Sequence, residues 1–233
     1  DDWEWRSRGV ELSLRRIAPS ALAGALAGDP GRAINPADLP LAPTRLAAFE
    51  LPWDGVGSGD TPALYAAVGS DGAGWNGAAL FVDQGDGQLI ALGPSPRRRA
   101  TLGTCLTALG RGSPHLFDRH GAVEVELAGA DLVLSDANPL QIGAGANRAL
   151  IGDEIVQFLN ADTLGGARWR LSGLLRGRGA TEGVAGSHAV GESFVLLDDG
   201  LHALDPAVVG SAANAVIVAI GLGDSEPAVA PIV

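Results

Sequence analysis

Two arginines near the middle of the C-terminal half are the residues best placed to make specific contacts. Arg176 and Arg178 follow an apolar run and are each followed by a single glycine. A guanidinium group offers planar donors that match a carboxylate or backbone carbonyls, and glycine lets another backbone approach closely. The pattern predicts a fixed structural clamp, with Glu182 or Glu154 as the partner. A contact with a neighbouring subunit is the second interpretation, and direct ligand binding is the third.

Other reactive side chains lack the spacing that catalysis or metal binding needs. His115 and His120 lie five residues apart beside Asp118, without the HExxH or CxxC spacing of a zinc site. Asp153 and Glu154 are adjacent in sequence, so on a strand they would face opposite sides. We therefore expect no enzyme activity, no metal and no cofactor.

Three further features point the same way. Glu124 and Glu126 alternate with valines, which a strand with a solvated acidic face explains. Cys105 is the single cysteine, so the chain has no internal disulfide, and the thiol is expected to pack in the core. The chain has no lysine, which excludes a phosphate-binding P-loop.

Two exposed-looking motifs have a functional and a structural interpretation. Trp75 and Asn76 lie in a glycine-rich loop and are candidate glycan contacts, although core or interface packing is favoured for the indole. Residues 97–99 are three consecutive arginines that could hold an acidic partner. A solvated turn in an acidic chain is the favoured interpretation.

Composition limits the classes of partner. The formal net charge of −11 argues against binding to nucleic acid or to an anionic membrane surface, which both need clustered cations. No apolar run approaches the ~18 residues of a membrane-spanning helix, so no membrane span is expected. The 34 glycines and 14 prolines favour many turns over long helices.

Short segments that alternate apolar and polar residues recur along the chain and predict an all-β protein, a sandwich or barrel of antiparallel sheets. Residues 122–127 and 131–135 are expected to form one of its hairpins. Pro139 interrupts the alternation and suggests a boundary. The expected parts are an N-terminal strand with an extended Pro- and Ala-rich connector over 1–43, a first β subdomain over 44–138, and a C-terminal β subdomain over 139–233.

The C-terminal motifs resemble those of phage tail-tip proteins of the gene-transfer-agent host-specificity type. The resemblance is strongest at residues 145–147, 152–158, 171–182 and 194–198. That family usually reads Arg-Gly-Arg-Arg-Gly-Thr-Glu in its central motif, whereas Gly179 and Ala180 stand here in place of an arginine and a glycine.

The resemblance implies a structural role in the baseplate of a phage, prophage or gene-transfer-agent particle. The protein would be made in the bacterial cytoplasm and incorporated into the virion tail. Its partners would be copies of itself and other tail-tip proteins, with a host surface polysaccharide as a further candidate. The alternative function is a carbohydrate-binding module for cell-surface glycans, and a hydrolase fragment is a third, less favoured option.

Overall fold

The regular structure is almost entirely antiparallel β, which confirms the predicted fold class. The computed structural model describes residues 41–53, 59, 61, 63–212 and 214–233, together with the backbone of 2–6 and 9–13. The chain divides into two units, Asp1–Asp38 and Leu39–Val233. None of the helices in the described residues is long and apolar enough to cross a membrane.

The first unit contains one antiparallel hairpin. Strand β1 (Asp2–Arg6) pairs with β2 (Gly9–Ser13), and Arg6 lies opposite Gly9. This hairpin lies where an N-terminal strand was expected within residues 1–43. The connector predicted over the remainder of 1–43 lies outside the described residues except for residues 41–43.

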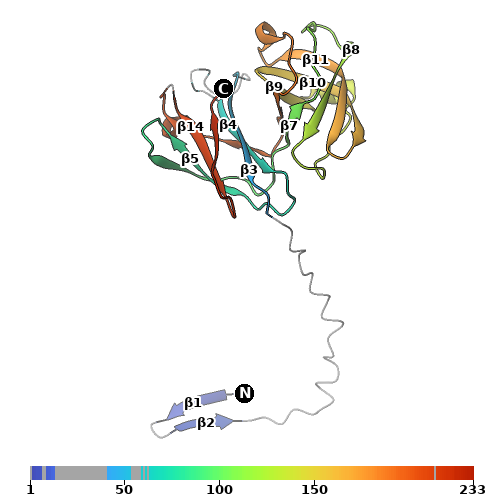
Figure 1. Ribbon diagram of the computed structural model, residues 1–233. Coiled ribbons are helices and arrows are strands. Elements are labelled where there is room, and N and C mark those ends of the chain that lie inside the picture. The colour runs from blue at the N-terminus through green and yellow to red at the C-terminus, as the bar shows by residue number, and fades with distance from the viewer. Residues whose placement is uncertain are drawn as a thin grey trace, which may run out of the picture. The chain divides into compact units, whose positions relative to one another are not determined.

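Two sheets of the second unit form a sandwich (Figure 1). The three-stranded sheet has the order β13 (Leu201–Ala203), β4 (Ala63–Ser70), β3 (Thr44–Leu51). The four-stranded sheet has the order β15 (Ala228–Pro231), β14 (Val216–Gly221), β5 (Ala78–Asp83), β6 (Leu89–Pro94). Between them lies a core of small and branched apolar side chains, with the short helix α3 (Pro206–Val209) contributing Val209.

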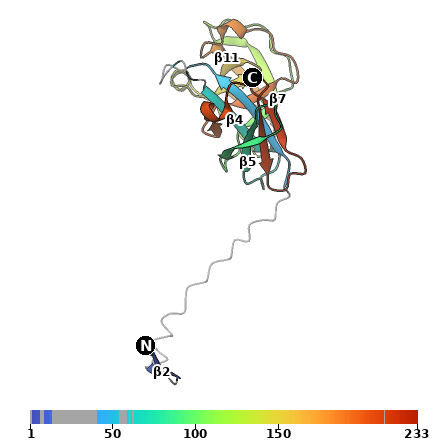
Figure 2. The same ribbon diagram turned by 90° about the vertical axis from the view of Figure 1, so that its left-hand side faces the viewer.

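Six strands close into a barrel, which lies beside the sandwich in Figure 1 and partly behind it in Figure 2. Their order around the barrel is β10 (Glu154–Gly165), β11 (Arg168–Arg178), β8 (Asp118–Leu127), β7 (Leu102–Cys105), β12 (Ser193–Leu196), β9 (Arg148–Ile151). Closure pairs every strand on both sides, so the barrel leaves no open sheet edge. Alternate side chains such as Val123, Val125 and Leu127 fill the interior.

The grouping of strands differs from the expected division at residue 138. Strands β8 and β9, on either side of that point, belong to the same barrel, and β13 to β15 return to the sandwich. Pro139 begins the short helix α2 (Pro139–Gly143), whose N-terminus is capped by Asn138, with Gln141 completing a capping box. The interruption in alternation is therefore a local helix between two barrel strands.

Sandwich and barrel share a third apolar cluster, to which Phe49, Ala67, Leu102, Ile155 and Val195 contribute. Strand β4 is consequently buried on both faces, and its small residues fit that position.

The arginine triplet lies on the linker between the sandwich and the barrel. Arg98 forms ion pairs with Asp198 and Asp199 on the second linker, at 3.0 Å to the Asp198 carboxylate. Arg99 pairs with Asp131 and donates to the Ser70 carbonyl at 3.1 Å. Two of the three arginines therefore connect segments of this chain.

Candidate functional site

The glycine-flanked arginine Arg176 points into the barrel because strand β11 changes face at a glycine. Gly173 has a φ of 64°, and on either side of it Leu171 and Leu174 both lie in the barrel core. An unbroken alternation would instead have directed Leu175 inward and Arg176 outward. Further along, one residue of β10, Val156, lies opposite both Arg176 and Gly177. This β-bulge sets the position of the arginine at the end of the barrel.

The Arg176 guanidinium is completely buried and every nitrogen has an acceptor. Nε donates to Glu154 Oε1 at 2.8 Å and Nη2 donates to Oε2 at 2.7 Å, a two-point pair with a carboxylate that is also fully buried. Nη1 donates to the Gly110 carbonyl at 2.7 Å, and Nη2 also donates to the Gly186 carbonyl at 2.9 Å. One side chain thus joins the barrel wall to two loops that cover its end.

The Glu154 carboxylate collects further donors. The Gly177 N–H donates to Oε1 at 2.6 Å, and His188 Nε2 lies 2.7 Å from Oε2. Burial acts to raise the pKa of Glu154, but the hydrogen bonds from Arg176, His188 and Gly177 outweigh it and hold the pKa below its ordinary value. Glu154 is therefore ionised at neutral pH.

His188 continues the cluster to a second carboxylate. Its Nδ1 lies 2.6 Å from Glu192 Oε2, and Glu192 Oε1 accepts from the Ala189 N–H at 2.7 Å. Burial opposes ionisation of Glu192, whereas the Ala189 and His188 hydrogen bonds lower its pKa below the ordinary value overall. The imidazole thus lies within hydrogen-bonding distance of a carboxylate at each of its two ring nitrogens. We call Arg176, Glu154, His188 and Glu192 the clasp.

The clasp also fixes backbone. His188 and Leu109 exchange two backbone hydrogen bonds, at 3.0 and 2.8 Å. The loop before β8 and the loop before β12 are thereby tied to each other as well as to Arg176. The arrangement suits the positioning of loops, because the buried polar groups of the clasp are bound to one another and to loop backbone.

The other predicted members of this site lie apart from the clasp. Arg178 is half-buried and donates to Gln157 Oε1 at 3.3 Å. Glu182 is exposed, and no ion pair of Glu182 is found in the described part of the chain. The structure thus selects Glu154 over Glu182 as the partner of Arg176. Sequence reasoning missed His188 and Glu192, because nothing in their spacing distinguishes them from ordinary loop residues.

Trp75 is a correction to the predicted glycan contact. Its side chain is 6% exposed, packs in the sandwich core and donates from Nε1 to Thr44 Oγ1 at 3.0 Å. A buried indole has no face for a sugar ring, and the loop glycines instead let the chain turn so that the ring enters the core. Asn76 is exposed, without the aromatic platform beside it that the prediction required.

The remaining reactive residues have structural surroundings. Glu124 and Glu126 lie on the outer face of β8 and pair with Arg170 and Arg168. Burial, with a contribution from Glu192, raises the pKa of Cys105 to about 11, so the thiol stays protonated and packs in the core. In the described ranges no group of three or more His, Cys, Asp or Glu is arranged to hold a metal ion.

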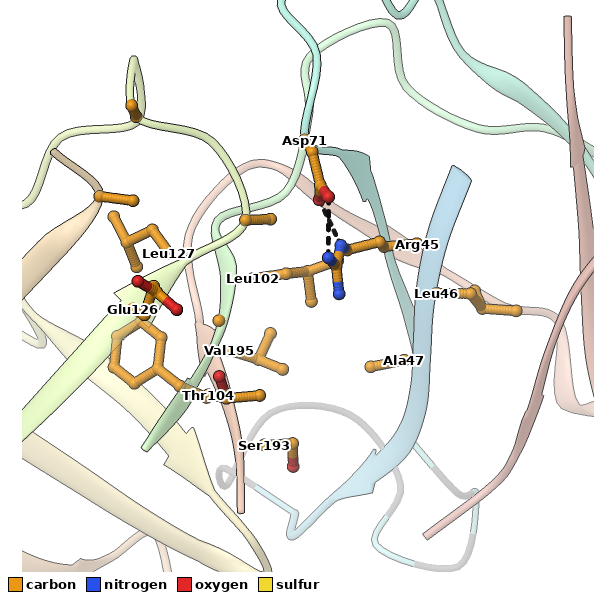
Figure 3. Close-up of a pocket in the computed structure, with 15 residues that line it drawn as sticks. Arg45, Leu46, Ala47, Asp71, Leu102, Thr104, Glu126, Leu127, Ser193 and Val195 are labelled. Carbon is orange, nitrogen blue, oxygen red and sulfur yellow. Dashed lines mark hydrogen bonds and ion pairs between the residues drawn. The ribbon is translucent and has the colours of Figure 1, made fainter. Parts of the chain in front are cut away.

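A cleft of about 640 Å³ separates β3 from the barrel strands β7, β8 and β12 (Figure 3). At its mouth Arg45 and Asp71 point toward one another and form an ion pair, with Nη2 to Oδ2 at 2.8 Å. Thr104, Glu126 and Ser193 supply the other polar groups. The arginine charge is already neutralised, and no histidine lies in the lining to activate either hydroxyl.

No curated protein sequence matches this chain. The residues matched by a protein family include the clasp. The match begins two residues before the first barrel strand, at Leu102, and stops one residue before the last barrel strand ends, at Leu196. Residues 100–195, which form the barrel, are similar to the family described as Rcc01698-like, C-terminal.

Proposed function

We propose that the chain is a structural module of the tail tip, or baseplate, of a phage-like or gene-transfer-agent particle, where it contributes to assembly and to contact with the host surface. The observation that carries the proposal is that the family match, residues 100–195, coincides with the six-stranded barrel. The strongest part of the tail-tip resemblance, which begins at residue 145, lies in the same segment except for residues 196–198.

The geometry of the barrel supports a mechanical role. The most specific polar residues of the chain, Arg176, Glu154 and His188, are used internally to hold two loops over the barrel end. Side chains fixed in this way keep a loop surface in one shape, which a repeated contact in a particle requires. The partners we propose are copies of this chain and other tail-tip proteins.

The test is location in the particle. Particles would be purified from a producing culture by density gradient and probed with antibody against residues 41–233. We expect the chain to sediment with tailed particles and gold-labelled antibody to mark the distal end of the tail. A chain found only outside the particle fractions would overturn the proposal.

A matched pair of variants connects that test to the clasp. Arg176→Lys should reduce incorporation into particles, because the loops lose their shared donor. Arg168→Lys changes an exposed pair with Glu126 on the same strand and should leave incorporation unchanged. If both variants were incorporated into particles equally, the clasp would not be required for assembly.

A further inference from the structure

A shallow hollow of about 340 Å³ lies at the end of the barrel, in the loop that leads into β8. Its lining includes Arg111, Leu116, Phe117, Arg119 and His120. Neither the clasp nor the cleft beside β3 includes any of these residues.

The hollow is lined by two arginines that form no ion pair with the residues described by the structure. Arg111 and Arg119 are exposed, and neither has an ion pair in the described part of the chain. The one carboxylate in the lining, Asp118, accepts the backbone N–H groups of His120 and Gly121 at 3.0 and 2.7 Å. In a chain of net charge −11, two free guanidinium groups around one hollow mark a site for an anionic group.

Apolar surface accompanies the charge. Leu116 is 69% exposed and Phe117 is half-buried beside it. An aromatic or aliphatic wall next to a guanidinium fork suits a ligand with an apolar face and a carboxylate, such as the ring of an acidic sugar.

The clasp holds this loop in position. Arg176 Nη1 binds the Gly110 carbonyl at 2.7 Å, one residue before Arg111. Gly112 lies so close to the Arg176 side chain that a Cβ there would be 2.7 Å from its Cγ. The backbone on both sides of Arg111 is therefore fixed by the buried arginine, and the hollow is formed before any ligand arrives.

We propose that this hollow binds an acidic saccharide unit, with Arg111 and Arg119 holding its carboxylate and Phe117 contacting the sugar ring. The net charge of the chain disfavours nucleic acid, whose duplex carries one negative charge per about 1.7 Å of its axis. The volume lies at the low end of ordinary ligand pockets, which span roughly 300–1,000 Å³, so the site suits a small unit. The inference rests on the host-surface part of the proposed function.

The test measures binding of the full chain to polygalacturonate by isothermal titration calorimetry, with dextran as the neutral polymer and polyglutamate as a non-saccharide polyanion. We expect binding to polygalacturonate, none to dextran, and at least tenfold weaker binding to polyglutamate. Arg111→Ala and Arg119→Ala should each weaken binding roughly tenfold, since each removes a charged hydrogen bond. Arg97→Ala, an exposed arginine with no ion pair among the described residues, is the matched control and should bind like the parent.

Several results would overturn the inference. They are no binding to polygalacturonate, equal binding by the arginine variants and the parent, and equal affinity for polyglutamate. Phe117→Leu should weaken binding to polygalacturonate and leave any residual binding to polyglutamate unchanged. If Arg111→Ala instead dissociates an oligomer of the chain, the hollow is a contact between copies and the saccharide assignment is wrong. Sedimentation with particles is a separate measurement, so this site can fail while the tail-tip proposal stands.

Discussion

The barrel and the sandwich differ in the kind of polar group that they bury. The barrel encloses Glu154, Arg176 and His188 at one end, whereas the buried polar groups of the sandwich are hydroxyls such as Thr44 and Ser70 and one indole N–H. A barrel has open ends that loops must cover, and the loop carbonyls then need donors. The sandwich covers its core with two sheets whose backbones are already paired.

This difference has an energetic consequence. A buried ion pair is costly to desolvate, so it contributes little net stability while it is intact, but loss of one partner leaves an uncompensated charge. Truncation of a sandwich side chain removes packing or one neutral hydrogen bond. We therefore expect the barrel to be the more sensitive region toward changes that keep side-chain shape and alter charge.

The largest effect is expected for Glu154→Gln. The amide has nearly the same shape but leaves the buried Arg176 guanidinium without its counter-charge, which should lower the free energy of unfolding by about 3–5 kcal/mol. Urea unfolding followed by tryptophan fluorescence would measure it. The control, Glu126→Gln, removes an exposed pair and should cost less than about 1 kcal/mol. If the two variants lost the same free energy of unfolding, the buried clasp would be no more sensitive to a change of charge than the exposed pair.

Arg176→Lys should come next, at about 2 kcal/mol, because the ammonium keeps the charge but cannot serve Glu154 and two carbonyls in one plane. Arg178→Lys is the matched control change two residues further along the strand. It affects a single hydrogen bond, from Arg178 to Gln157 at 3.3 Å. We expect its melting temperature to stay close to that of the parent. A stable Arg176→Lys variant would show that charge, without the fork geometry, maintains the clasp.

For the sandwich, Trp75→Phe should cost about 1–2 kcal/mol, since an aromatic side chain is kept but the smaller ring leaves a cavity and one neutral hydrogen bond to Thr44 is lost. Thr44→Val removes the same hydrogen bond from the other side. If the two changes act through it, the double variant should be less destabilised than the sum of the single variants. A cost as large as that of Glu154→Gln would contradict the expected order of the two regions.

The smallest effects concern acid stability, for which each region has a carboxylate with a lowered pKa. Burial opposes ionisation of Glu192 and Asp224, but hydrogen bonds to each carboxylate lower its pKa below the ordinary values of 4.5 and 3.8. A group with a lowered folded-state pKa stabilises above its ordinary pKa, and this stabilisation is lost as pH falls through the folded-state value.

We therefore expect Glu192→Gln and Asp224→Asn each to reduce the loss of stability between about pH 5 and pH 3. This pH range spans the ordinary pKa values of both carboxyl groups. Urea midpoints at each pH would measure the slope. Asp86→Asn, which alters an exposed hairpin carboxylate, is the control and should keep the slope of the parent. Parallel slopes for all the variants would show that neither carboxylate contributes to acid stability.

The strands were predictable from the sequence wherever their side chains alternate between core and solvent. Residues 122–127 are an example, and they lie within β8. The predicted hairpin partner at residues 131–135 was wrong, because those residues form no strand. Asp131 pairs with Arg99 and Leu134 is buried, so contacts with distant segments position a stretch that by its pattern resembles a strand.

The sequence alone determined the all-β class, the excess of acid over base, and the presence of an arginine suited to a clamp, because these depend on composition and on neighbouring residues. Only the tertiary structure decided that Arg176 points inward, that its partner is Glu154, and that His188 completes the cluster. The change of face at Gly173 reverses the side to which the arginine points, and the histidine arrives from a loop that barrel closure brings near. Residues 12 and 22 positions from Arg176 meet in one buried site because six strands close on themselves, a condition that no local pattern encodes.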